Sequence, residues 1–123
     1  MTESSTLASA DARLETIARL NDRCRQGLDR TAQINMTRTC LATFAEDRGG
    51  EIVAQGEILA MLRAHRFSDA EAGERNRGSF EYRGTTVYFC IDYYDAAMEY
   101  GSEDPADASQ TRRVLTIMLR GDL

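Results

Sequence analysis

The chain has 123 residues and a formal net charge of −5, with a sequence pI of about 4.9. This length is typical of one domain. The acidic balance argues against a general affinity for nucleic acid or anionic lipid, since both need a positive field. No apolar run approaches the ~18 residues of a membrane span, and the N-terminus lacks the basic-then-apolar pattern of a signal peptide. We therefore expect a cytoplasmic protein that binds no membrane and does not bind nucleic acid directly.

The cysteines and the single histidine bear on redox chemistry and metal binding. Cys24, Cys40 and Cys90 are an odd number without CxxC spacing, so we interpret them as reduced, mostly buried thiols. His65 is the only histidine, which leaves too few ligands for a typical zinc site. We expect neither a metal nor a cofactor.

The first half of the chain predicts two helices. The first should run from about Ala10 to Gln26, after a disordered tail at residues 1–8, and should end at Gly27. The second should run from about Glu51 to Arg66. Their apolar positions recur near the helical period: Leu14, Ile17, Leu20, Cys24 and Leu28 in the first helix, and Ile52, Leu59 and Leu62, with Ile58 and Met61, in the second.

The longest run of β-branched and aromatic residues is Thr85–Tyr94. Both of its faces stay apolar until Asp92, which predicts a central strand covered on both faces over its first half. Ser79–Arg83 should precede it in a hairpin, with a tight turn at Arg83-Gly84 or Gly84-Thr85.

Two further segments are strand candidates. Thr31–Thr37 alternates apolar and polar side chains, as a half-exposed edge strand does. Arg38–Ala45 is ambiguous and suggests one or two helical turns. Arg112–Arg120 fits a helix or a strand, and its Val, Thr and Ile favour a strand that returns beside the central one.

Together these elements predict a single α+β domain over residues 9–123. We expect about four strands in a mostly antiparallel sheet. Two main helices should pack on one face of that sheet.

The segment Asp92–Thr111 is acidic and rich in tyrosine, and it contains no Lys or Arg. One interpretation is a negative surface that docks on a basic groove, where Tyr side chains supply rigid contact area. The other is a solvated loop whose Asp side chains cap turns. The candidate partner-binding residues are Asp92, Tyr94, Asp95, Glu99, Tyr100, Glu103, Asp104 and Asp107.

Other charged groups allow different interpretations. Asp92, Asp95 and Glu99 could form a metal-binding or hydrolytic site. The Arg-rich stretch 63–83 could contact nucleic acid. Arg112-Arg113 should pair internally with Asp107 or Glu103 and order the loop.

No catalytic residue is predicted. His65 has no accompanying Cys or Ser motif, and Gly49-Gly50 and Gly73 lie outside any nucleotide-binding pattern. We expect a protein that is not an enzyme.

The last third of the chain carries a specific series of residues: Ile91-Asp92-Tyr93-Tyr94-Asp95, Tyr100-Gly101-Ser102, Asp104-Pro105-Ala106-Asp107 and Thr111 to Leu119. With Ile17 to Asp22 and Ser79-Phe80-Glu81, this series resembles an uncharacterised family of short bacterial proteins, a domain of unknown function. The likeness covers about residues 16 to 119. It implies a shared fold, and the family's occurrence among accessory proteins of mobile elements implies a role in host interference.

These observations predict a non-enzymatic acidic binding protein. It would inhibit or modulate a protein partner by occupying that partner's basic nucleic-acid-binding surface, as an anti-CRISPR or anti-restriction protein does. The partner would be a CRISPR or other nucleic-acid-processing complex. The alternatives are the carboxylate-based metal-binding or hydrolytic protein and a weak nucleic-acid-binding accessory protein.

Overall fold

A computed structural model describes residues 2–123, with side chains from residue 9 onward. The elements in chain order are α1 (Thr2–Arg25), β1 (Gln33–Met36), α2 (Arg38–Thr43), α3 (Gly50–Ala64), β2 (Arg77–Tyr82), β3 (Thr85–Tyr94), β4 (Arg112–Met118) and the 3₁₀ helix η1 (Arg120–Asp122). The fold is α+β, as predicted. α1 begins at Thr2 and not near Ala10, so the predicted start of the first helix was wrong. The expected disorder of residues 1–8 stays a prediction.

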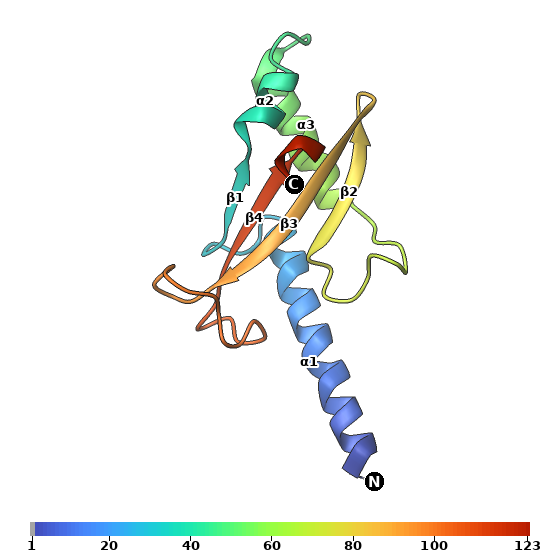
Figure 1. Cartoon of the computed structure of the whole chain (residues 1–123), viewed down its shortest axis with the longest axis vertical. Coiled ribbons are helices and arrows are strands. Elements are labelled where there is room, and N and C mark those ends of the chain that lie inside the picture. Colours follow the sequence, from blue (N-terminus) through green and yellow to red (C-terminus); the bar gives the residue numbers. More distant parts are fainter. Residues whose placement is uncertain (1) are drawn as a thin grey trace.

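The four strands form one sheet in the order β1-β4-β3-β2 (Figure 1). β3 pairs antiparallel with both β2 and β4, and β1 pairs parallel with β4. The sheet is therefore mostly antiparallel, as expected. The segment after the acidic loop is a strand that returns beside β3, and β1 lies at an edge, so both of these predictions are confirmed.

The β2–β3 hairpin closes at Arg83-Gly84, the first of the two predicted turns. Both residues have a positive φ, 50° for Arg83 and 79° for Gly84. Two consecutive positive φ values define a type I′ turn, whose twist matches that of the strands it joins. The hairpin thus fixes the register of the two strands.

The core lies between one face of the sheet and the helices. Val87, Phe89 and Ile91 alternate inward along β3, and Leu115 and Ile117 do so along β4. Figure 1 shows α3 running behind the sheet, while α1 extends beyond its lower end. The helical segments contribute Cys24, Cys40, Phe44, Ala54, Ile58 and Leu62 to this one cluster.

Near the N-terminus of α3, the buried residues differ from those predicted. Ile52 is 84% exposed, whereas Ala54, Ile58 and Leu62 are fully buried. These three residues recur every four positions and form one stripe. Ile52 precedes the stripe by two positions, which places it roughly 200° around the helix. Its predicted burial was wrong because the stripe begins at Ala54.

The outer face of β3 is only partly covered, so the predicted cover on both faces was wrong. Tyr88 and Cys90 are half-buried there, and Asp92 is exposed. Their cross-strand neighbours Met118 and Thr116 supply the partial shielding. The described helices place their buried residues against the opposite face.

No helix in residues 2–123 combines the length and the hydropathy that a bilayer crossing requires.

Gly78 and Gly56 offer a matched pair of glycine-to-alanine substitutions with opposite expected effects. A Cβ on Gly78 would lie 2.7 Å from Phe89 Cζ and 2.9 Å from His65 Nε2, whereas a Cβ on Gly56 meets nothing within 4 Å. We expect Gly78→Ala to lower the free energy of unfolding by about 1–3 kcal/mol through overpacking. Gly56→Ala should raise it by roughly 0.5–1 kcal/mol, because alanine loses less entropy in a helix. Urea denaturation of both variants tests this pair, and equal effects would contradict it.

Candidate functional site

The acidic segment Asp92–Thr111 forms an ordered excursion between β3 and β4. Its base is closed by backbone hydrogen bonds: the Asp95 amide donates to the Tyr100 carbonyl at 2.7 Å, and the Ser102 amide donates to the Tyr93 carbonyl at 3.0 Å. Tyr94 and Gly101 form an additional β-bridge. The segment therefore presents its side chains from a defined backbone.

Two aspartates of the segment cap turns within it. Asp95 Oδ1 accepts from the Glu99 amide at 3.0 Å, and Asp104 Oδ1 accepts from the Ala106 amide at 3.1 Å. Arg13 of α1 also donates to Asp104 Oδ1 at 3.1 Å. Short carboxylate side chains typically make such contacts with nearby amides.

Asp107 is held in the same way. Its Oδ1 accepts from the Ser109 hydroxyl at 2.6 Å and from the Ser109 amide at 2.9 Å, and its Oδ2 accepts from Gln110 Nε2 at 2.7 Å. These donors, the Ser109 hydroxyl first, hold the pKa of the Asp107 carboxyl below its usual value. The capping interpretation thus applies to Asp95, Asp104 and Asp107.

The other candidate residues of the segment face solvent. Asp92, Glu99 and Glu103 are exposed, and Tyr100 is 73% exposed. Tyr100 and Glu103 line a shallow hollow of about 500 Å³ together with Asp95, Ala96, Ala97, Gly101 and Gln110. Tyr94 is half-buried on the outer face of the sheet, opposite Arg112. The structure thus separates residues that hold the segment from residues available to a partner.

The base of the segment is anchored by the buried side chain of Arg113, which is 1% exposed. Its Nε donates to Asn21 Oδ1 at 2.7 Å, and its Nη2 donates to the Pro105 carbonyl at 2.6 Å. The guanidinium also lies 5.1 Å from the centre of the Tyr93 ring. Burial lowers the pKa of this guanidinium from its usual value.

The predicted pairing of Arg112-Arg113 with Asp107 or Glu103 was wrong. Arg113 points inward along β4, toward α1, so its guanidinium meets Asn21. In the described part of the chain, the Arg112 side chain donates only to the Thr111 carbonyl, at 3.3 Å.

Asn21 was not identified from the sequence, although it connects several elements. Its Nδ2 donates to the Tyr93 hydroxyl at 2.7 Å and to the Glu74 carbonyl at 3.0 Å, while its Oδ1 accepts from Arg113. Burial is also the main cause that raises the pKa of Tyr93. The one available signal was the position of Asn21 four residues after Ile17, on the buried face of α1.

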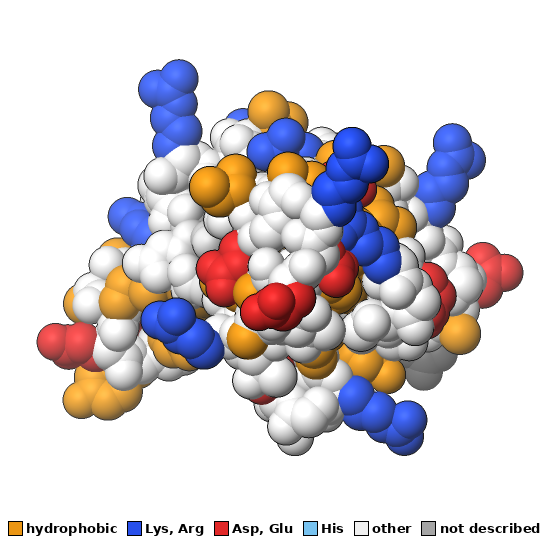
Figure 2. Space-filling view, turned by 90° about the horizontal axis from the view of Figure 1, so that it is seen from above, with side chains coloured by type: hydrophobic (Ala, Val, Ile, Leu, Met, Phe, Trp, Pro, Cys, Tyr) orange, Lys and Arg blue, Asp and Glu red, His pale blue; other side chains and the backbone are white. Residues whose placement is uncertain are grey.

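Several arginines of the predicted basic surface form ion pairs with carboxylates of the same chain. Arg75 binds Asp22 through two hydrogen bonds, Nε to Oδ1 at 3.1 Å and Nη2 to Oδ2 at 2.8 Å. Arg83 pairs with Asp47 and Glu57, each at 3.0 Å. On the face seen in Figure 2, Arg side chains project at separate places and acidic side chains lie between them. This arrangement gives little support to a nucleic-acid contact at residues 63–83.

Arg25, the last residue of α1, is buried, although a charged side chain usually lies on the exposed face of such a helix. It is 5% exposed, and its Nη1 donates to the Leu62 and Arg63 carbonyls at 3.0 and 2.8 Å. These carbonyls lie in the last turn of α3, where the His65 amide also donates to the Leu62 carbonyl at 3.3 Å. A buried cation at this C-terminus therefore joins α1 to α3.

The carboxylates proposed for metal binding are not arranged as a site. Asp95 uses Oδ1 to hold the Glu99 amide. In the described part of the chain, no group of three or more His, Cys, Asp or Glu side chains is placed to hold a metal.

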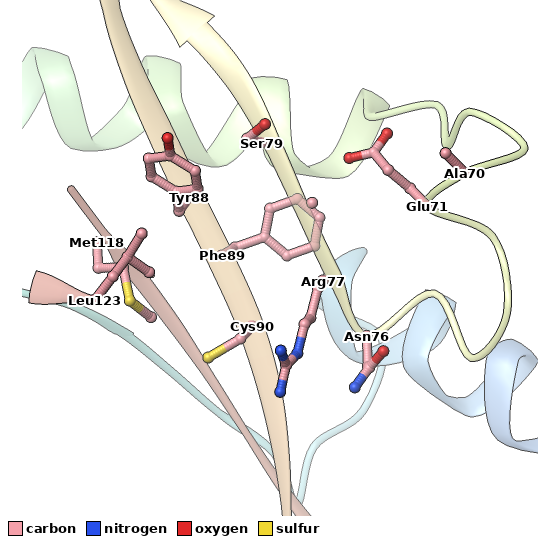
Figure 3. Close-up of a pocket in the computed structure, with 11 residues that line it drawn as sticks. Ala70, Glu71, Asn76, Arg77, Ser79, Tyr88, Phe89, Cys90, Met118 and Leu123 are labelled. Carbon is pink, nitrogen blue, oxygen red and sulfur yellow. The ribbon is translucent and has the colours of Figure 1, made fainter. Parts of the chain in front are cut away.

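A larger pocket of about 570 Å³ lies beside the outer face of the hairpin (Figure 3). In Figure 3, Tyr88, Cys90 and Met118 line one side, and Ala70 and Glu71 approach from the loop before β2. Burial raises the pKa of the Cys90 thiol, so this thiol is protonated at neutral pH and is a poor nucleophile. The full lining is Ala70, Glu71, Asn76, Arg77, Gly78, Ser79, Tyr88, Phe89, Cys90, Met118 and Leu123.

Comparison with protein families identifies the group to which the chain belongs. The family model described as "Protein of unknown function (DUF3768)" matches residues 37–122, so the chain belongs to this family. The match runs from the N-cap of α2 to η1 and leaves out α1 and β1. It therefore excludes residues 16–36, which the expected likeness had included. No curated protein and no solved structure matches the chain.

We expect Asn21→Ala to lower the free energy of unfolding by about 2–4 kcal/mol, because it leaves the buried Arg113 and Tyr93 groups without a shared partner. Asn35→Ala is the matched control: Asn35 is exposed on the edge strand β1, and its removal should change stability by less than ~0.5 kcal/mol. Urea denaturation measures both. Equal stabilities of the two variants would contradict the role of Asn21.

His65 should make stability depend on pH. Burial, more than any other cause, lowers its pKa from the usual 6.5, so the folded state binds its proton less readily than the unfolded state. The contribution that neutral His65 makes to the free energy of unfolding is complete above pH 6.5. It is lost as the pH falls through the lower pKa of the folded state. We expect His65→Phe, which places a ring that does not titrate beside Phe67 and Phe89, to lose less stability than the parent between pH 7.5 and 5. Parallel pH curves in urea denaturation would contradict this assignment.

Proposed function

We propose that the chain is a non-enzymatic binding protein that modulates a protein partner by occupying the partner's basic nucleic-acid-binding surface. The observation that supports this proposal best is the arrangement of the acidic segment. Asp95, Asp104 and Asp107 fasten its turns, and Glu99, Tyr100 and Glu103 remain exposed on it.

The exposed residues have the chemistry of a contact surface. Carboxylates attract Arg and Lys side chains that otherwise bind phosphates, and complementary charge speeds association. Tyr100 offers a large, rigid side chain with a polar tip, a type that is enriched at the centres of interfaces. A segment already ordered by its own hydrogen bonds loses little entropy when it binds. We assign partner contact to Asp92, Glu99, Tyr100 and Glu103, with Tyr94 beside them.

The concrete form of this proposal is an inhibitor of a CRISPR or restriction complex, carried with bacterial mobile elements and acting in the cytoplasm. Neither alternative has comparable support. The metal-binding interpretation needs Asp95, which caps a turn. The nucleic-acid interpretation needs arginines such as Arg75 and Arg83, which are paired with carboxylates.

The test is capture of partners by the tagged chain from a nuclease-treated bacterial lysate, followed by affinity measurement with the partner that is found. Reversal of three exposed charges, Asp92→Lys with Glu99→Lys and Glu103→Lys, should weaken binding roughly a hundredfold or more, because like charges across an interface cost several kcal/mol. Tyr100→Ala should also weaken it. The affinity should fall as salt is raised.

The control reverses the same number of charges elsewhere. Asp11, Glu46 and Asp69 are exposed, and their side chains make no hydrogen bond or ion pair among the described residues. Asp11→Lys with Glu46→Lys and Asp69→Lys should keep binding within a few fold. Equal loss in both triple variants would show that only net charge matters. A partner that binds the Asp92, Glu99 and Glu103 variant normally would refute the proposed surface.

A further inference from the structure

A separate pocket of about 360 Å³ lies where the end of α1 and the turn after it meet the last residues of the acidic segment. We call it the Arg113 pocket. Its polar lining consists of Arg23, Asp29, Arg30, Thr31, Thr111 and Arg113, and Leu20, Leu28 and Ala108 complete it. It is distinct from the hollow beside Tyr100.

Arg113, which lines this pocket, is a buried cation without a close anionic partner. The acceptors of its Nε and Nη2 are the neutral oxygens of Asn21 and Pro105. Among the described residues its Nη1 donates no hydrogen bond, and no carboxylate lies within 4.0 Å of it. Asp29 and Glu74 act on it only from a greater distance. A buried guanidinium with only neutral partners is costly, and an anion bound beside it would offset that cost.

The rim of the pocket adds positive charge. Arg23 and Arg30 are exposed there; Arg23 Nη2 donates to the Leu28 carbonyl at 3.3 Å, and the Arg30 side chain has no partner among the described residues. Asp29 is the one carboxylate of the lining. Its Oδ1 already accepts from the amide and the hydroxyl of Thr31, at 2.9 and 2.8 Å. The lining thus includes three arginines and a single carboxylate, which is engaged in a turn.

We propose that the Arg113 pocket binds a phosphate group carried by a small molecule. A guanidinium group can donate two parallel hydrogen bonds to two oxygens of one phosphate. A phosphate carries about 1.5 to 2 negative charges, which would balance the excess positive charge of the pocket lining. The pocket volume falls within the ~300–1,000 Å³ of typical small-molecule sites and exceeds the size of a bare phosphate. The apolar residues Leu20, Leu28 and Ala108 would contact the body of the ligand.

The site lies against the base of the acidic segment. Thr111 Oγ1 donates to the Asp104 carbonyl at 2.8 Å, and Arg113 holds the Pro105 carbonyl. The ligand would therefore contact residues that order the segment. The proposal itself does not depend on the function assigned to the exposed carboxylates.

The experiment is a titration of the full chain with ribose 5-phosphate, inorganic phosphate and malonate at constant ionic strength, followed by ¹H–¹⁵N NMR. We expect saturable shifts at the amides of Thr31, Thr111 and Arg113, with ribose 5-phosphate binding more tightly than inorganic phosphate, and malonate more weakly than both. Absence of saturation with every probe would overturn the proposal. Equal or tighter binding of malonate would overturn the assignment to phosphate.

Arg30→Ala and its control Arg48→Ala test the location of the site. Both side chains are exposed and lack partners in the described part of the structure, so both variants should fold. We expect Arg30→Ala to weaken ribose 5-phosphate binding by at least about tenfold, the loss of one charge-assisted contact, and Arg48→Ala to leave it unchanged. Unchanged binding in Arg30→Ala, or equal loss in both, would refute the site. Since no protein partner is present, neither result bears on the proposed inhibitor function.

Discussion

The buried guanidinium of Arg113 is the interaction on which the arrangement of this molecule depends. It joins β4 to α1 through Asn21, to β3 through the Tyr93 ring, and to the acidic segment through the Pro105 carbonyl. Removing a charge from water is costly unless its donors find acceptors. The three segments must therefore meet at one place, and α1 is held to the sheet by a polar contact as well as by the apolar core.

Three of the four aspartates in the acidic segment order its turns, whereas Asp92 and the two glutamates are exposed. Asp95, Asp104 and Asp107 reach the amides of their own turns, whereas Glu99 and Glu103 are exposed. An aspartate is short enough to bond an amide of its own turn, here two to four residues further along the chain. Net charge alone does not distinguish these two roles, although the proposed function depends on the difference.

The chain presents opposite charge at two places along this segment. Asp95 and Glu103 line the hollow beside Tyr100, and three arginines line the pocket at the base of the segment. The family match begins at residue 37, yet Asn21 and Arg23 belong to α1, before that match. The helix therefore supplies both the partner of Arg113 and part of the rim of its pocket, so the proposed phosphate site needs α1.

Local signals in the sequence were enough to predict four strands, the hairpin turn and the acidic segment, but not the parallel pairing of β1 with β4. Alternation along Thr85–Tyr94, a turn at Arg83-Gly84, and Val, Thr and Ile in β4 are local signals, and local periodicity sets the strands. Tertiary structure alone decided which polar groups are buried. Asn21, Arg25 and Arg113 are of polar or charged types usually found at the surface, and most of their hydrogen-bond partners lie 37 to 92 positions away. Hydrogen bonds between residues so far apart produce no repeating pattern in the sequence. For this reason the sequence analysis paired Arg113 with nearby carboxylates.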